Sequence, residues 1–141
     1  MPKVILFLTR NPKIAEFMFR TDDVVVFLDR SFRDLLRLKE RLPPQVRILE
    51  ISERLQQSAT ELRRPFLELY GDLAHRLNSL AWWFSTAASR NSQSCPIFRH
   101  TCYLRITQGL LQTERGRLIV IAESRGLLKA IVHLLGRLNI P

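Results

Sequence analysis

The sequence predicts an α/β protein built on a Rossmann-like parallel sheet of about four strands. Four short apolar runs have the length and the β-branched composition of strands, namely residues 4–9, 23–28, 46–51 and 117–122. The first, second and fourth are nearly continuous in Val, Ile, Leu and Phe, which is typical of strands covered on both faces. Helical patterns lie between the runs, and this alternation favours a parallel sheet with right-handed crossovers.

The connections between the runs differ in length. After the first run, Asn11-Pro12 favours a turn and leaves room for only about two helical turns, residues 13–20. Ser31 is a suitable N-cap for a helix over residues 32–42, which Pro43-Pro44 ends.

The third connection, residues 52–116, is far longer than a crossover needs and predicts a helical insertion. Apolar residues recur in it at steps of three and four: Leu55, Ala59, Leu62, Phe66, Leu69, Leu73, Leu77 and Leu80. Pro65 is expected to kink this helix or to start a second one. A further helix is expected over residues 97–111.

These elements predict one Rossmann-like domain over residues 1–141, with strand order 3-2-1-4. In that order the first and fourth strands meet at a topological switch point, where ligands bind outside the carboxyl ends of the strands. The expected floor of this cleft consists of Thr9, Arg10, Asn11, Glu123, Ser124 and Arg125. Ser124, Arg125 and Gly126 at a helix start favour an anionic or hydroxyl-rich ligand, although a simply capped helix explains them equally well.

Cofactor and metal sites are not predicted. The turn from Leu8 to Lys13 contains no glycine, which argues against a dinucleotide site. Asp29 occupies the place of a ribose-binding carboxylate, but a capping role fits it better. Cys95, His100 and Cys102 lack a fourth ligand for zinc, and no catalytic set is evident, so catalytic residues stay unassigned.

The net charge of +9 raises the question of a polyanionic partner. Counting gives 18 Arg and 4 Lys, spread from Arg10 to Arg137 rather than clustered, which favours a solvated surface over a nucleic-acid face. A basic nucleic-acid-binding module and a protein-interaction domain that uses the leucine seam remain alternatives. Two isolated cysteines and the lack of a long apolar segment predict a cytoplasmic protein, with peripheral contact to the inner membrane as an option.

A stretch rich in aromatic and polar residues supplies further ligand-binding candidates. Tryptophan faces stack on sugars or bases, and Ser, Arg and Asn donate hydrogen bonds to hydroxyls or phosphate. The candidates are Trp82, Trp83, Ser85, Ser89, Arg90 and Asn91. The alternative is a corner between helices, packed by its aromatic side chains.

The same stretch carries a resemblance. Leu80-Ala81-Trp82-Trp83 with Ser85, Ser89-Arg90-Asn91, Ser94-Cys95-Pro96 and Cys102-Tyr103-Leu104 resemble the N-terminal region of bacterial surface-carbohydrate biosynthesis proteins, which are similar to GT-B type glycosyltransferases. The resemblance implies an acceptor-side domain, the N-terminal half of a larger two-domain protein and inactive alone. Its implied partners are a glycan or lipid-linked glycan acceptor and a missing C-terminal domain or partner chain.

Overall fold

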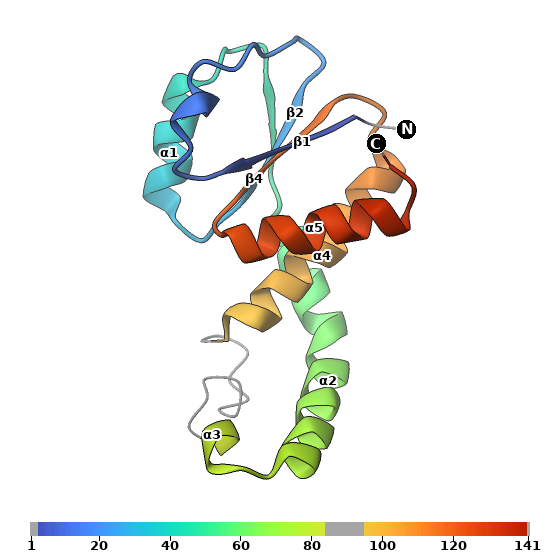
Figure 1. Cartoon of the computed structure of the whole chain (residues 1–141). Helices are drawn as coiled ribbons and strands as arrows, with labels where there is room; N and C mark the ends of the chain where they lie inside the picture. Colours follow the sequence, from blue (N-terminus) through green and yellow to red (C-terminus); the bar gives the residue numbers. More distant parts are fainter. Residues whose placement is uncertain (1–2, 84–94, 141) are drawn as a thin grey trace. The chain divides into compact units, whose positions relative to one another are not determined.

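The computed structural model describes residues 3–83 and 95–140, which form two compact units (Figure 1). One unit comprises Met1–Ile51 and Thr107–Pro141 and contains the sheet, and the other comprises Ser52–Ile106 and is helical. The elements in chain order are β1 (Val4–Leu8), η1 (Pro12–Ile14), β2 (Val24–Leu28), α1 (Phe32–Arg41), β3 (Arg47–Leu49), α2 (Ser52–Leu77), α3 (Leu80–Trp83), α4 (Pro96–Thr113), β4 (Leu118–Ala122) and α5 (Arg125–Arg137).

The predicted α/β class is confirmed, because the four strands form one all-parallel sheet. The predicted order 3-2-1-4 is wrong: the order is β1-β4-β2-β3, so β4 lies between β1 and β2. A central strand must be covered on both faces and hydrogen-bonded along both edges. All five residues of β4 are buried, whereas all five residues of β1 are only half-buried, as an edge strand allows.

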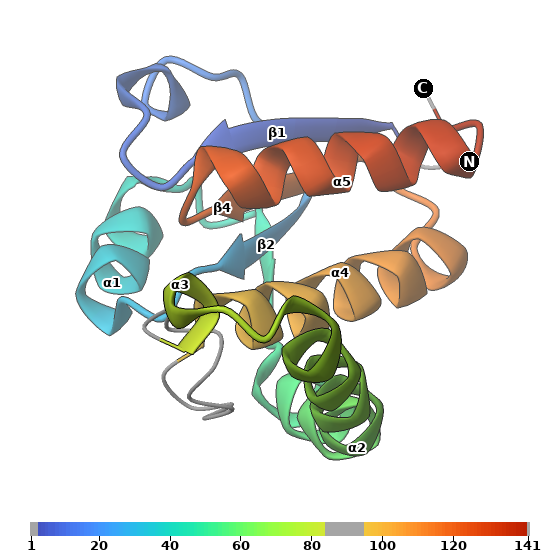
Figure 2. The same cartoon turned by 60° about the horizontal axis from the view of Figure 1, so that its bottom comes forward.

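The two faces of the sheet are covered by different segments. Side chains at odd positions join one apolar cluster: Ile5, Phe7, Val25, Phe27, Ile119 and Ile121. Leu35, Leu38 and Leu42 in and after α1 pack against them, as do Ile14, Phe17 and Phe19 of the connection from β1 to β2. Helix α5 contacts β1 and β4, buries Leu127 and Ile131, and covers the opposite face (Figure 2).

A buried ion pair lies at the edge of the sheet where the strands begin, called here the amino edge. Arg117, just before β4, donates from Nε and Nη2 to the two carboxylate oxygens of Asp23, just before β2, at 2.6 Å each. The Asp23 side chain is 0% exposed and that of Arg117 is 12% exposed. Arg117 also donates to the carbonyl oxygen of Met18 at 3.1 Å and lies over the ring of Phe17. The pair therefore ties β4 and β2 to the connection that follows β1.

The helical unit has an aromatic core of its own. Phe66 and Tyr70 of α2 stack with ring centroids 4.3 Å apart, and the ring of Phe98 meets Phe66 edge-on at 4.8 Å. Cys95 and Cys102 are free, buried thiols in the same cluster, and burial raises the pKa of the Cys102 thiol. A thiol buried in this way is poorly reactive.

Helix α2 runs through Pro65, so Pro65 does not start a second helix. Phe66, Tyr70 and Ala74 are buried beyond the proline, and this packing holds the helix together despite the missing N–H donor. Beyond Phe66 the predicted leucine seam holds only at Leu73, which is half-buried, because Leu69, Leu77 and Leu80 are exposed. Across residues 3–83 and 95–140, no helix combines the length and the apolar character needed to cross a membrane.

Removing the guanidinium of Arg117 would leave the buried carboxylate of Asp23 without its partner. Hydrogen bonding to Arg117 holds the pKa of Asp23 below its ordinary value of 3.8, so this pair stabilises the fold above about pH 4, and its contribution falls as the pH drops through the lowered pKa. We expect Arg117→Met to lower the free energy of unfolding at pH 7 by about 3–5 kcal/mol. The deficit should narrow as the pH falls, because burial without Arg117 raises the pKa of Asp23 in the variant and the carboxyl becomes protonated there, whereas the paired Asp23 of the wild type stays ionised to lower pH. Urea denaturation across this pH range, with the exposed Arg115→Met as control, measures both effects; equal losses in the two variants would contradict the assignment.

Gly116 precedes Arg117 at a close backbone approach. A Cβ atom there would lie 2.8 Å from the backbone oxygen of Asp22, whereas a Cβ at Gly136 in α5 would meet nothing within 4 Å. We expect Gly116→Ala to destabilise the protein by about 1–3 kcal/mol. Gly136→Ala should instead stabilise it by about 0.4–1 kcal/mol, because the unfolded chain loses conformational freedom. Thermal unfolding of the two variants should shift in opposite directions, and shifts of the same sign would contradict this reading.

Candidate functional site

The carboxyl ends of three strands meet at one edge of the sheet. Leu8 of β1 is paired with Ala122 of β4, and Ala122 is paired with Leu28 of β2. The residues that follow, Thr9, Glu123 and Asp29, therefore lie side by side although they are distant in sequence. This edge of a parallel α/β sheet is where ligands usually bind.

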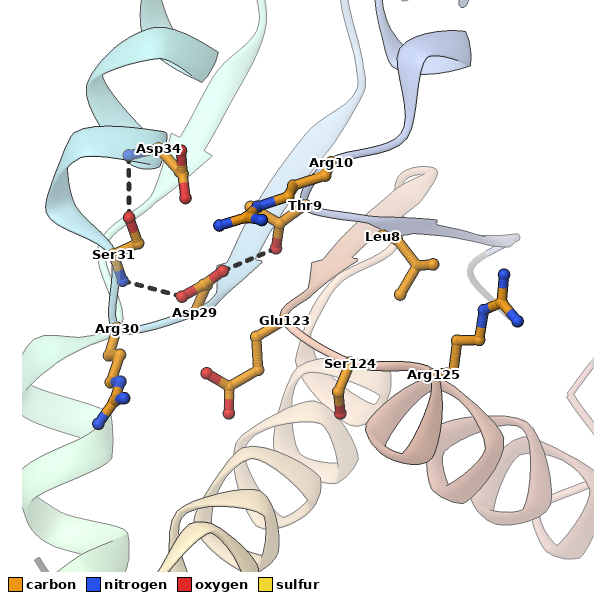
Figure 3. Close-up of a pocket in the computed structure, with 10 residues that line it drawn as sticks. All are labelled: Leu8, Thr9, Arg10, Asp29, Arg30, Ser31, Asp34, Glu123, Ser124 and Arg125. Carbon is orange, nitrogen blue, oxygen red and sulfur yellow. Dashed lines mark hydrogen bonds between the residues drawn. The ribbon is translucent and has the colours of Figure 1, made fainter. Parts of the chain in front are cut away.

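A cleft opens at this edge because the chain leaves the strands in two directions. After β1 and β2 it turns to the face that α1 covers, and after β4 it enters α5 on the opposite face. The space left above the end of β4 is a cleft of about 700 Å³ (Figure 3). Its lining comprises Leu8, Thr9, Arg10, Asp29, Arg30, Ser31, Asp34, Glu123, Ser124 and Arg125.

Thr9 fastens the three strand ends together. Its backbone N–H donates to the carbonyl oxygen of Ala122 at 2.9 Å. Its hydroxyl lies 2.8 Å from Oδ2 of Asp29 and 3.0 Å from the carbonyl oxygen of Ala122, so it bridges the end of β4. On the other side, the N–H of Glu123 donates to the carbonyl oxygen of Leu28 at 3.1 Å.

Asp29 has both carboxylate oxygens occupied. Oδ2 accepts from Thr9, and Oδ1 accepts from the backbone N–H of Ser31 at 2.9 Å, which forms a turn into α1. Ser31 in turn caps α1 by accepting from the N–H of Asp34 at 3.2 Å. Asp29 thus positions the start of the helix, which favours the structural role over that of a ribose ligand.

Ser124 caps α5 in the same manner, accepting from the N–H of Leu127 at 3.2 Å. Two capped helix N-termini, those of α1 and α5, therefore begin at the cleft. Each carries a partial positive charge and further backbone N–H groups that the cap does not use.

Three guanidinium groups and three carboxylates line the cleft, but only one of the guanidinium groups points toward its centre. In Figure 3 the Arg10 side chain reaches toward Asp29, whereas those of Arg30 and Arg125 point away from the centre. The remaining carboxylates belong to Glu123 and to Asp34, which lies 3.5 Å from Arg37. The centre of the cleft therefore combines hydroxyl and carboxylate oxygens with one guanidinium.

Five residues of the predicted floor line this cleft: Thr9, Arg10, Glu123, Ser124 and Arg125. Asn11 lines a neighbouring cavity instead. The prediction missed Arg30, Ser31 and Asp34, because it considered only the first and fourth strands. The sequence did indicate their position, because they follow the second predicted strand and residues that follow parallel strands lie at the same edge of the sheet.

The aromatic candidates Trp82 and Trp83 belong to the helical unit. Trp82 is half-buried in the helical unit, where its ring packs near Tyr70 with centroids 5.9 Å apart, as the corner alternative predicts. Trp83 ends α3. Ser85, Ser89, Arg90 and Asn91 lie outside the described residues. Within residues 3–83 and 95–140, no group of three or more His, Cys, Asp or Glu side chains is placed to hold a metal ion.

The hydroxyl of Thr9 offers a direct test of how the strand ends are joined. We expect Thr9→Val to cost about 1 kcal/mol or more of stability, because the variant keeps the shape of the side chain but leaves Oδ2 of Asp29 without the hydroxyl donor, while the carbonyl oxygen of Ala122 keeps the backbone N–H of residue 9. Thr113→Val is the matched control, since that hydroxyl bonds only to backbone carbonyl oxygens of its own helix, those of Gly109 and Leu110. Denaturant titration compares them, and equal effects would show that the bridge contributes nothing.

Comparisons with known proteins assign no family to this arrangement. No family model, curated protein or solved structure matches the chain. The resemblance to surface-carbohydrate biosynthesis proteins stays a prediction, and much of its specific part, between Trp83 and Cys95, lies outside the described residues.

Proposed function

We propose that the chain binds a phosphate-bearing sugar in the cleft, as the acceptor-side domain of a glycosyltransferase-like protein of bacterial surface polysaccharide synthesis. The observation that carries the proposal is the cleft itself. It lies at the carboxyl ends of the parallel strands, where the chain continues to opposite faces of the sheet. Its volume of about 700 Å³ lies in the range of small-molecule sites.

The lining supports a ligand that carries both hydroxyl groups and negative charge. The carboxylates of Glu123 and Asp34 are hydrogen-bond acceptors, as sugar hydroxyls require. Arg10 supplies a fixed positive charge that matches phosphate, and the N-termini of α1 and α5 favour anions at the same edge. Thr9 and Asp29 hold these elements in place through their shared hydrogen bond.

The glycosyltransferase assignment extends this binding role through the resemblance of the residue 80–104 stretch. In that arrangement the acceptor sits on this domain and a second domain holds the sugar donor. The chain by itself is then a binding domain, with Glu123 and Arg10 in contact with the acceptor and no transfer reaction of its own.

A titration of the labelled protein with glucose 1-phosphate tests the binding role. We expect the amide NMR signals of residues 9–10, 29–34 and 123–127 to shift. Glucose and inorganic phosphate should cause smaller shifts, because glucose lacks the phosphate group and inorganic phosphate lacks the sugar hydroxyls. Arg10→Gln should weaken binding of glucose 1-phosphate about tenfold, the loss of one charge-assisted hydrogen-bonding group. N-acetylglucosamine 1-phosphate serves as a second probe of the sugar.

Arg115→Gln is the matched control, since Arg115 is exposed in the connection that precedes β4, at the other edge of the sheet. It should leave the affinity unchanged. NMR shifts spread evenly over the arginine-rich surface, or equal losses of affinity in the two variants, would overturn the proposal. Either result would favour general binding of polyanions instead.

A further inference from the structure

A second cavity of about 310 Å³, the slot, adjoins the cleft and shares Thr9, Arg10 and Asp34 with it. Its floor consists of Ile14, Phe27, Leu38 and Ile121. These side chains come from η1, β2, α1 and β4, and all four belong to the apolar cluster on the α1 face of the sheet. The slot therefore opens directly onto the hydrophobic core of this unit.

The short connection from β1 to β2 explains why this space is open. A full crossover helix would cover this face beside α1, but the only helix in the connection, residues 9–23, is the three-residue η1. The floor residues are fixed within the packed core, since each is at most 7% exposed. A rigid, preformed apolar floor is the usual setting of a ligand pocket.

The rim of the slot is basic. It carries Arg10, Arg37 and Arg41 against a single carboxylate, Asp34. Arg37 lies 3.5 Å from Asp34 in an exposed contact, and within the described part of the chain no ion pair engages Arg10 or Arg41. Arg37 and Arg41 are four residues apart on α1, a spacing at which like charges repel. An anion between these guanidinium groups would relieve that repulsion.

We propose that the slot holds the aliphatic part of a phosphate ester, with the phosphate bound by Arg10, Arg37 and Arg41. The inference rests on the proposed function and deepens it, because the slot and the cleft share Thr9, Arg10 and Asp34. One ligand can thus place its phosphate at Arg10, its chain in the slot and its hydroxyl-bearing part in the cleft. The floor offers no polar side chain to a nucleobase, whose amide groups would lose their hydrogen bonds there.

Alkyl phosphates below their micelle concentration test the slot without requiring the natural ligand. Affinity should rise from inorganic phosphate through butyl and hexyl to octyl phosphate, by about threefold to fourfold for each methylene that is buried. Octanol should bind at least tenfold more weakly than octyl phosphate, because it lacks the charge. Uridine monophosphate should gain less over inorganic phosphate than octyl phosphate does, because its base has no hydrogen-bonding partner in the apolar slot.

The variant Arg37→Gln/Arg41→Gln should weaken octyl phosphate binding at least tenfold and glucose 1-phosphate binding by a smaller factor, because Arg10 and the cleft side chains still hold the sugar phosphate. Arg33→Gln is the matched control, because Arg33 is exposed on the same helix and does not line the slot. It should change neither affinity. Circular dichroism of each variant checks that α1 remains folded.

Three results would overturn the slot assignment: affinity independent of chain length, equal losses in Arg33→Gln and the double variant, or a gain for uridine monophosphate equal to that for octyl phosphate. Binding only to vesicles that contain phosphatidic acid would also overturn it, since it would point to a membrane surface rather than one enclosed chain. If glucose 1-phosphate binds normally in these cases, the proposed function survives. If glucose 1-phosphate itself fails to bind, the proposed function falls independently.

Discussion

The position of β4 between β1 and β2 is the constraint on which the rest of the sheet unit depends. It gives the sheet a central strand that is buried on both faces and hydrogen-bonded along both edges. It also separates β1 from β2, so that Thr9 and Asp29 can meet only by reaching across the end of β4. The cleft exists because α5 then leaves this central strand toward the face opposite α1.

The two edges of the sheet use charge differently. At the amino edge, Asp23 and Arg117 are desolvated and paired in bidentate geometry, which makes them a structural contact. At the carboxyl edge, Arg10 is exposed and lies among hydroxyls, carboxylates and helix N-termini. A charge that is already buried and neutralised gains little from a ligand, whereas one in a solvated cleft keeps its capacity to bind one. The carboxyl edge is therefore the one suited to recognition.

Local patterns in the sequence predicted the strands and the Ser31 and Ser124 caps, because each depends on neighbouring residues. Most of the cleft floor followed from the rule that ligands bind at the carboxyl ends of parallel strands. The strand order was not predictable in this way, since β1, β2 and β4 are all continuously apolar, and only burial in the folded sheet distinguishes the edge strand β1 from the inner strands β2 and β4. The arginines appeared dispersed because Arg10 is remote in sequence from Arg37 and Arg41. Only the packing of α1 beside the β1–β2 connection brings them to one rim.

The interruption of the sheet unit by residues 52–106 has a consequence for synthesis on the ribosome. β4 is the last strand to emerge, yet it is the partner that β1 and β2 share. Until it arrives, β1 has no strand to pair with, while β2 can pair only with β3 and the helical segment can form from contacts closer in sequence. A nascent chain stopped before Leu118 therefore leaves β1 as an unpaired apolar segment, exposed to association with other chains.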